Sequence, residues 1–181
     1  MEYKIVFAGV TGAGKTTAIG SVSEIDPVRT DVRNHDASLA KEFTTVGLDY
    51  GEVALEGSDR LRLYGTPGQT RFEFMWRIVS QGALGLVLLA DNSQDGALDA
   101  IDTYIDGFSE LIDRTACVIG VGRSESHSEP GLDDYADRLA ERGVICPVVP
   151  VDVRRRSDVL MLLDLLLTQL EMKTGTTDEL F

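Results

Sequence analysis

The sequence predicts an α/β fold, in which a mixed sheet of six strands, one of them antiparallel, is covered by helices on both faces to give three layers. Short apolar runs alternate with longer helical patterns, and near-continuous apolar strands are typical of a parallel sheet buried on both faces. Two of the runs are joined only by the turn EGSD at 56–59, which predicts an antiparallel hairpin. The length of 181 residues suits one domain of this kind.

Each strand is expected where an apolar run ends at a glycine-rich or polar turn. The strands are YKIVFA at 3–8, LDYGEVAL at 48–55, RLRLY at 60–64, LGLVLLA at 84–90, ACVIGV at 116–121 and CPVVPV at 146–151. Helical patterns lie between them at 14–24, 70–81, 97–113, 132–142 and 157–172. The last helix is apolar around most of its circumference, which favours packing on the sheet and leaves open a partner or self-association surface. The polar segment 24–44 has no strong periodicity, as is typical of functional loops.

Composition narrows the function classes. A net charge of −13 argues against binding to nucleic acid or to an anionic membrane, because both present phosphates that an acidic surface repels. Cys117 and Cys146 lie in apolar runs and are expected to be buried free thiols in a reducing compartment. The chain shows no signal peptide, no bilayer-length apolar run and no lipid-attachment motif. We therefore expect a cytoplasmic protein without a nucleic-acid partner or a lipid anchor.

The stretch GVTGAGKT at 9–16 matches the phosphate-binding pattern G-x-x-x-x-G-K-[ST] in full, between an apolar strand and a helix. Its glycines let the backbone N–H groups of residues 12–16 point at phosphate oxygens, and the helix N-terminus adds positive charge. Lys15 is expected to reach the β- and γ-phosphates, and the Thr16 hydroxyl to ligate Mg²⁺. The nucleotide-binding residues expected in this loop are Gly9, Thr11, Gly12, Ala13, Gly14, Lys15, Thr16 and Thr17.

Two further stretches narrow the type of phosphate-binding protein: TTVGLDYGEVAL at 44–55 and LYGTPGQTRFEFMW at 63–76. A threonine that opens a strand, then a hairpin, then a P-G-Q turn leading into a helix resembles the two switch regions of Ras-superfamily GTPases. The TPGQ form, with Gly65 in place of the usual acid, resembles the bacterial MglA-like and Rup-type small GTPases, over residues 3–172. The resemblance implies a small-GTPase-like P-loop domain at 1–173, followed by a flexible C-terminal tail at 174–181.

The resemblance also implies roles for single residues. Thr45, or its neighbour Thr44, would complete the Mg²⁺ shell and sense the γ-phosphate; the alternative is a β-branched pair that only opens a strand. Gly68 would donate its N–H to the γ-phosphate. Gln69 would orient the attacking water, unless it is only a polar residue of an exposed turn. The expected catalytic residues are Lys15 and Gln69, and the expected metal ligands are Thr16 and Thr45.

Two departures from the family pattern predict slow hydrolysis. The acid missing at Gly65 would hold Mg²⁺ through water, and Asp49 or, less readily, Asp91 is the candidate substitute. The alternative is that either residue is only a solvated loop acid. MglA-like proteins place an arginine just before the switch threonine, where this chain has Thr44, and such an arginine is worth about 10³–10⁵ in turnover. Either a partner supplies an arginine, or one of three in this chain does: Arg29, Arg33 or Arg71.

The base-reading motifs are altered. The place of the usual N-K-x-D holds Gly122-Arg123-Ser124-Glu125, where Glu125 would accept hydrogen bonds from guanine and Arg123 would cover the base. The usual S-A-K aligns with Asp152-Val153-Arg154, where the Val153 N–H would meet guanine O6 and Asp152 would fix the loop. A polar loop without base contacts is the alternative. The expected cofactors are GTP or GDP, preferred over ATP, and Mg²⁺.

Three functions remain open. The leading one is a GTP-binding molecular switch in cell polarity, motility or signalling, with slow GTP hydrolysis assisted by an activating partner, for which the resemblance implies a roadblock-fold protein. An effector would bind the switch regions, where the aromatic segment 72–76 is either a surface that changes with the nucleotide or ordinary core. The second is a non-hydrolysing scaffold that keeps its nucleotide. The third is a small-molecule kinase with Arg154–Arg156 as a phosphate lid.

Overall fold

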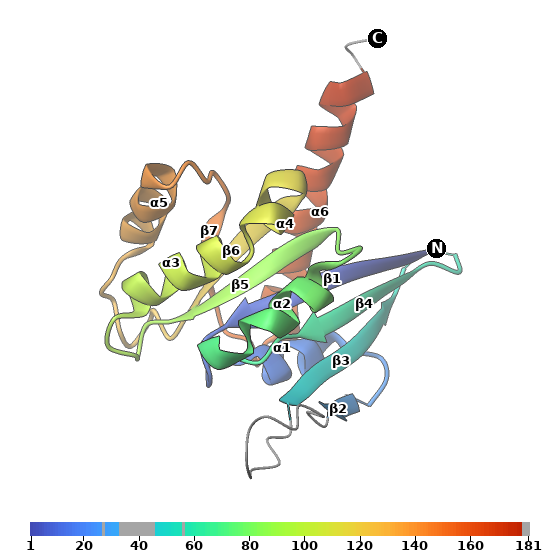
Figure 1. The fold of residues 1–181 in the computed structure, drawn as a ribbon, viewed down its shortest axis with the longest axis horizontal. Coiled ribbons are helices and arrows are strands. Elements are labelled where there is room, and N and C mark those ends of the chain that lie inside the picture. The colour runs from blue at the N-terminus through green and yellow to red at the C-terminus, as the bar shows by residue number, and fades with distance from the viewer. Residues whose placement is uncertain (27, 33–45, 56, 179–181) are drawn as a thin grey trace.

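The computed structural model describes residues 1–26, 28–32, 46–55 and 57–178, and their fold is α/β (Figure 1). The strands are β1 (Glu2–Gly9), β2 (Val28–Val32), β3 (Val46–Ala54), β4 (Arg60–Gly65), β5 (Gly85–Asp91), β6 (Ala116–Gly122) and β7 (Val148–Val151). The helices are α1 (Lys15–Val22), α2 (Glu73–Ser80), α3 (Ala97–Gly107), α4 (Ser109–Arg114), α5 (Leu132–Glu141) and α6 (Arg156–Asp178), with a 3₁₀ turn η1 at Thr70–Phe72.

One mixed sheet contains every described strand, in the order β2-β3-β4-β1-β5-β6-β7. The strand β3 is antiparallel to both of its neighbours, β2 and β4. The remaining pairs, β4–β1, β1–β5, β5–β6 and β6–β7, are parallel. The chain leaves central β1 for α1 and later returns to β1's two sides through β4 and β5. The ends of the parallel strands therefore meet at one edge of the sheet, which is where ligands bind in folds of this class.

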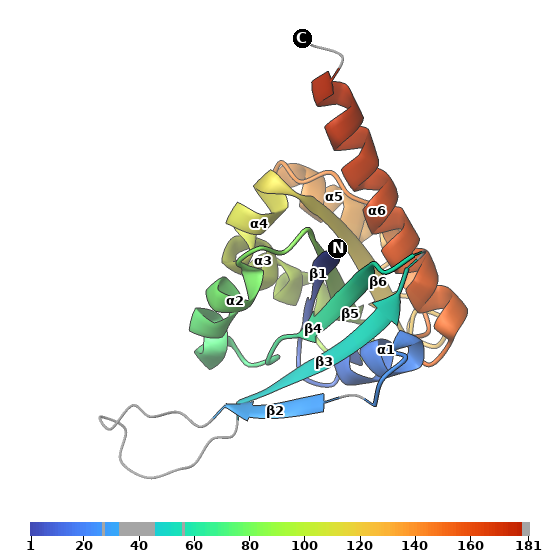
Figure 2. The ribbon, with the colours of Figure 1, turned by 90° about the vertical axis from the view of Figure 1, so that its right-hand side faces the viewer.

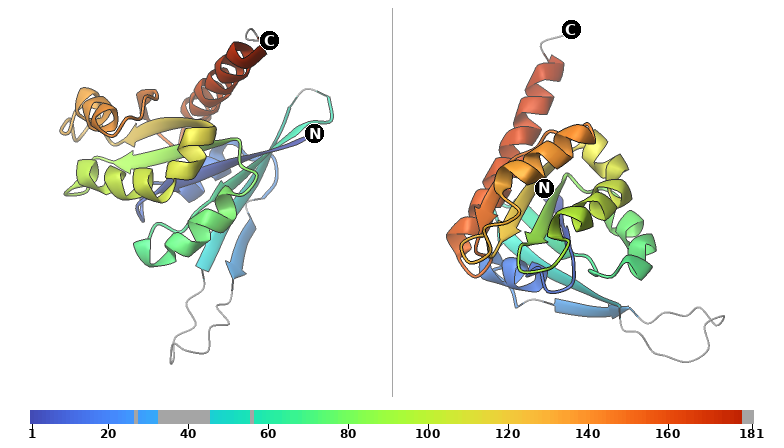
Figure 3. Two further views of the ribbon diagram at one scale, coloured as in Figure 1. Left: turned by 45° about the horizontal axis from the view of Figure 1, so that its top comes forward. Right: turned by 90° about the vertical axis from the view of Figure 1, so that its left-hand side faces the viewer.

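Helices cover both faces of the sheet, as the views at right angles show (Figure 2). The helices α1 and α6 pack on one face over a core that includes Ile5, Phe7 and Leu162. On the other face, α2 to α5 pack over a second core that includes Val6, Leu86 and Ile119 (Figure 3). Adjacent residues of β1 enter opposite cores, because successive side chains of a strand point to opposite faces.

The expected three-layer α/β fold with one antiparallel strand is confirmed, and all six expected strands are present. The seventh, β2, was not predicted. Its sequence VRTDV lies in the polar segment 24–44 without a continuous apolar pattern, so its pairing with β3 rather than its own residues specifies it. The expected helix 97–113 is divided at buried Phe108 into α3 and α4. The helix α6 continues past 172 to Asp178, through part of the expected tail.

None of the described helices is long and apolar enough to cross a membrane.

Candidate functional site

The phosphate-binding pattern forms the loop between β1 and α1, as expected. Gly12 and Gly14 have φ values of 85° and 95°, a backbone region that other residues rarely adopt, and Gly14 is the N-cap of α1. The Ala13 N–H donates to Val10 O at 3.1 Å and closes the turn. Thr11 and Thr17 are exposed, whereas Ala13 is buried. The sequence forms a narrow loop that ends at a helix N-terminus, the local geometry that binds phosphate.

The Lys15 ammonium folds back over this loop. Its Nζ donates to Gly9 O at 2.6 Å and to Val10 O at 2.9 Å, and the residue is only 7% exposed. Burial lowers the pKa of Lys15 to about 8, and the nearby carboxylate of Asp49 partly opposes that shift. The lysine is therefore still charged at pH 7, in a place where removal from water strengthens its attraction for an anion.

A carboxylate from β3 lies beside Gly65, the position where the family pattern has an acid. Asp49 is the register partner of Gly65 across the antiparallel pair β3–β4, and its Oδ2 accepts a hydrogen bond from the Thr16 hydroxyl at 2.5 Å. A Cβ added at Gly65 would lie 3.0 Å from Asp49 Cβ and 3.1 Å from Asp49 Oδ2. A side chain at 65 would therefore crowd that of Asp49, the first of the two sequence-based candidates for the missing acid.

The second candidate acid, Asp91, is engaged with Arg123 and Ser93. Asp91 is buried, forms an ion pair with Arg123, and accepts hydrogen bonds from the Ser93 N–H at 3.0 Å and the Ser93 hydroxyl at 2.6 Å. Burial alone would raise the pKa of Asp91, but the hydrogen bonds from Ser93 and Arg123 outweigh it and lower the pKa. The carboxylate charge is already balanced by an arginine.

The P-G-Q turn after β4 lies directly against the phosphate-binding loop. A Cβ at Gly68 would lie 2.4 Å from Thr11 N and 2.7 Å from Val10 C, so only glycine fits this approach. Just before the turn, Thr66 is buried and donates its hydroxyl to Phe7 O at 3.2 Å. The side chain of Gln69 is exposed. The structure thus places Gly68 next to the loop that precedes Lys15 and leaves Gln69 facing solvent.

The two altered base-reading stretches come together beside the same loop. Arg123 adopts a φ of 59°, and its guanidinium approaches Gly12 O at 3.4 Å and 3.5 Å. Asp152 accepts a bidentate pair of hydrogen bonds from the Arg154 side chain at 2.8 Å each, which holds the pKa of Asp152 well below its usual range. Val153 contacts the phosphate-binding loop, because a Cβ at Gly14 would lie 2.7 Å from Val153 Cγ2.

Glu125 lies on the facing loop. It is exposed. The pKa of the Arg154 guanidinium is raised mainly by its hydrogen bonds to Asp152, and the charge of Glu125 adds to that rise. The residues expected to read the base therefore share one end of the phosphate-binding loop.

Sequence reasoning missed one buried group that supports the loop after β6. The Asn92 side-chain amide donates to His127 O and to Pro130 O, both at 2.9 Å, and its oxygen accepts the Tyr135 hydroxyl at 2.7 Å. Asn92 and Tyr135 are both buried. The only signal in the sequence was a polar residue immediately after the apolar run of β5.

The expected switch threonines, Thr44 and Thr45, lie outside the described residues, as does Arg33. Of the other two arginines considered as internal substitutes, Arg29 belongs to β2 and is the register partner of Asp49. Arg71 places its guanidinium over the Phe72 ring at 4.8 Å from the centroid.

The three arginines of the run Arg154–Arg156 each have a partner within the chain. Arg154 and Arg155 pair with Asp152, and Arg156 donates to Val22 O at 2.9 Å at the end of α1. These three guanidinium groups fix the loop after β7 and the start of α6. The observation that suggested a kinase lid therefore has a structural explanation.

The aromatic segment of the second switch region is mostly core. Phe72, Met75 and Trp76 are buried, whereas Phe74 is 51% exposed and Ile78, one turn later, is 55% exposed. The segment thus divides into an inner face that packs on the domain and a small outer apolar face.

Comparison with known proteins gives distant matches to one group. The chain is 27% identical to the Ras-related protein Rab-8A of Gallus gallus over 111 residues, which are 60% of this chain and 48% of that protein. It is 27% identical to Rab-8A of Pongo abelii over 143 residues, 76% of this chain and 64% of that protein. Rab-8B of Bos taurus matches at 27% identity over 111 residues. The chain thus spans about half to two thirds of the length of these curated relatives.

No protein-family model matches the sequence. The Rab matches support a Ras-like small GTPase in general, and they do not distinguish a bacterial MglA-like or Rup-type subgroup.

Proposed function

We propose that this chain is a GTP-binding molecular switch of the bacterial MglA-like kind, which hydrolyses GTP slowly and with the help of a partner. The observation that supports it best is the convergence of three groups at one sheet edge. Charged Lys15 lies over the phosphate-binding loop, the Thr16 hydroxyl meets the Asp49 carboxylate, and Gly68 abuts the same loop. A lysine, a hydroxyl–carboxylate pair and a glycine turn against the loop are the parts that a triphosphate-sensing switch needs.

The residues around Thr16 suit Mg²⁺. Mg²⁺ prefers oxygen ligands and keeps several waters, and the Thr16 hydroxyl with the Asp49 carboxylate at 2.5 Å offers such oxygens. Thr16 would ligate the ion directly, Asp49 would hold it through water, and Thr45 would be the second direct protein ligand. When bound, Mg²⁺ would neutralise charge on the phosphate oxygens. The chain's own contribution is to orient these oxygens and to exclude bulk water with the β3–β4 pair.

Hydrolysis without a partner is expected to be slow. Gln69, which would orient the water, is exposed, and the Arg71 guanidinium is stacked on Phe72 rather than turned to the phosphate-binding loop. An arginine at the transition state is worth about 10³–10⁵ in rate. A partner, in this proposal a roadblock-fold activator, would supply that arginine or fix the position of Gln69.

Guanine is the base that the site favours. Glu125 is an acceptor beside the Arg154 loop, and guanine offers donors at N1 and N2 where adenine offers an acceptor at N1. The Val153 N–H would meet guanine O6. Effectors would bind the outer face of α2, where Phe74 and Ile78 are exposed one turn apart. The proposed setting is cytoplasmic polarity, motility or signalling.

The first test is nucleotide extraction from the purified chain, then calorimetry with GTP, GDP and ATP in the presence of Mg²⁺. We expect GTP and GDP to bind more tightly than ATP. Lys15→Ala should weaken GTP binding by at least about tenfold, because a charge-assisted contact to phosphate is lost. Lys173→Ala is the matched control, since Lys173 is exposed and contacts Thr115 O at the opposite edge of the sheet. Absence of any nucleotide binding by the wild-type chain would refute the proposal.

Single-turnover hydrolysis separates the switch from a non-hydrolysing scaffold, which the exposed position of Gln69 and the engaged position of Arg71 also favour. A switch predicts slow conversion of bound GTP that Gln69→Ala abolishes, with Gln81→Ala, an exposed glutamine at the other end of α2, as control. A scaffold predicts GTP that survives purification unhydrolysed and is indifferent to Gln69→Ala.

A further inference from the structure

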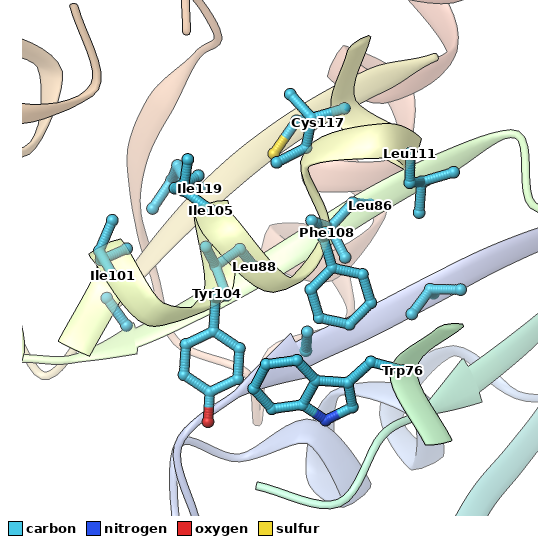
Figure 4. Packing of buried hydrophobic residues seen from close by; sticks show 14 of the residues in the cluster. Trp76, Leu86, Leu88, Ile101, Tyr104, Ile105, Phe108, Leu111, Cys117 and Ile119 are labelled. Carbon is cyan, nitrogen blue, oxygen red and sulfur yellow. The ribbon is translucent and has the colours of Figure 1, made fainter. Parts of the chain in front are cut away.

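Two buried aromatic side chains hold the P-G-Q turn by its backbone. The Trp76 Nε1–H donates to Pro67 O at 3.1 Å, and the Tyr104 hydroxyl donates to Gly68 O at 2.9 Å. We propose, on the basis of the proposed function, that Trp76 and Tyr104 are positioning residues, which orient the N–H of Gly68 toward the triphosphate. They are held by the aromatic stack (Trp76, Tyr104 and Phe108), which joins α2 to α3 and its C-terminal end (Figure 4).

Trp76 acts on the N–H of Gly68 through one planar peptide unit. The carbonyl of Pro67 and the N–H of Gly68 belong to the same peptide bond, and in a trans peptide the two point in opposite directions. Because the indole draws the Pro67 carbonyl toward α2, the Gly68 N–H is turned away from the aromatic stack. On its other side, Gly68 abuts Thr11 of the phosphate-binding loop.

Tyr104 fixes the next peptide unit in the same way. Its hydroxyl binds the Gly68 carbonyl, and that carbonyl shares a peptide bond with the N–H of Gln69. Burial raises the pKa of Tyr104 above its ordinary value, so the phenol remains a hydrogen-bond donor at neutral pH. Two consecutive peptide planes are therefore set from α2 and α3, on either side of the residue that would sense phosphate.

The stack is built to hold the indole in one place. Trp76 is 0% exposed, and its ring lies 4.8 Å from Tyr104 and 5.2 Å from Phe108, nearly parallel to both. A Cβ at Gly107 would lie 2.6 Å from the Trp76 atoms Cε3 and Cζ3, so a side chain there would displace the ring. An indole fixed on three sides has little conformational freedom, and its hydrogen bond therefore holds the Pro67 carbonyl in one orientation.

The chain contains one tryptophan, so the same residue reports on the turn. We would measure the affinities for GDP and for a non-hydrolysable GTP analogue, together with tryptophan emission, in wild type, Tyr104→Phe and Tyr3→Phe. Tyr104→Phe removes only the hydroxyl and keeps the ring stack. Tyr3→Phe removes a hydroxyl that binds Asp59 at the far end of β1, and it is the matched control. Trp76→Phe tests the indole donor by affinity alone.

The expected result is a selective loss. Tyr104→Phe and Trp76→Phe should lower the ratio of GTP-analogue to GDP affinity by about tenfold, because one backbone donor to the third phosphate is misdirected, while GDP affinity stays within about twofold of wild type. In wild type the emission should differ between the two nucleotides, and Tyr104→Phe should reduce that difference. Ratios unchanged in both variants would overturn the inference while leaving the proposed function intact. A wild type that binds no nucleotide would overturn both.

Discussion

Exchange of the residues at 49 and 65 tests whether the acid of this site has moved from β4 to β3. Gly65→Asp would place a second carboxylate in space that Asp49 fills, since the new Cβ lies 3.1 Å from Asp49 Oδ2 and 3.1 Å from Ile19 Cδ1. Asp49→Gly would empty that space and remove the acceptor of the Thr16 hydroxyl. The double variant restores one carboxylate, now from β4. We therefore expect each single change to be harmful and the pair to compensate.

The size of the compensation follows from the charges. Two carboxylates roughly 4 Å apart repel by about 4 kcal/mol at the effective dielectric constant of a partly exposed site. Alternatively, one of the two carboxyl groups can take up a proton. Protonation at pH 7, about three units above the ordinary pKa of an aspartate, costs about 1.36 kcal/mol per unit, so the penalty has the same upper limit of about 4 kcal/mol. Because Asp49 is only half-buried, solvent screening lowers the expected cost to about 2–4 kcal/mol. For a domain of this length, that is a fall of about 5–12 °C in Tm.

The assay is a double-mutant cycle by thermal and urea unfolding, with nucleotide release in Mg²⁺ and in chelator as a second readout. We expect a favourable coupling energy of at least about 2 kcal/mol between the two changes. The penalty of Gly65→Asp should shrink steadily as the pH falls from about 7 toward about 4, because one of the two carboxyl groups can then take up a proton at lower cost. Asp49→Gly should make nucleotide release less dependent on Mg²⁺, and the double variant should restore part of that dependence. Additive effects, or a Gly65→Asp variant as stable as wild type, would refute the reasoning.

Three other predictions follow from the titrating groups. Because burial lowers the pKa of Lys15 to about 8, GTP binding above pH 8 should take up about one proton. Calorimetry in buffers of different ionisation enthalpy measures this uptake, which should be absent in Lys15→Met. The nucleotide-free chain should gain stability as the pH rises from 8 toward 10.5, because the unfolded chain binds more protons than the folded chain in that range. Arg123→Ala should lower stability by about 1–3 kcal/mol through the unpaired carboxylate of Asp91. Because the folded-state pKa of Asp91 is lowered, this loss should shrink as the pH falls below about 4 and disappear once the pH is below that lowered pKa. An alkylating reagent should modify Cys146 before Cys117, because the hydrogen bond between the two thiols lowers the pKa of half-buried Cys146 and raises that of buried Cys117. Peptide mapping measures the order, and modification of Cys117 first would contradict the hydrogen bond between the two cysteines.

Sequence reasoning located those features whose residues follow one another in the chain. The phosphate-binding loop was placed correctly because its glycines and its flanking strand and helix are contiguous in the chain. Continuous apolar runs marked β1, β5 and β6 for the same reason, since burial on both faces leaves no polar positions. The strand β2 has no such run, and only its partner β3 makes it a strand.

Contacts between distant residues were beyond a single sequence. The ion pair of Arg123 with Asp91 joins residues 32 positions apart, and the hydrogen bond from Tyr135 to Asn92 spans 43 positions. Each residue alone looks like an ordinary loop acid, base or amide. The segment around Trp76 was left open between core and surface, because an aromatic residue on a helix has the same pattern in both cases.

In the proposed function, Asp49 supplies from β3 the acid that the sequence motif lacks in the turn after β4. In an antiparallel pair, residues directly opposite each other project their side chains to the same face and at close range. Asp49 and Gly65 are such a pair, so a carboxylate on either strand reaches nearly the same point beside Thr16. Side chains on both strands would crowd each other at this point, since a Cβ at Gly65 would lie 3.0 Å from Asp49 Cβ. A motif search that looks for the acid within the turn segment 65–69 alone fails on this chain, whereas a search across the register of the two strands finds it.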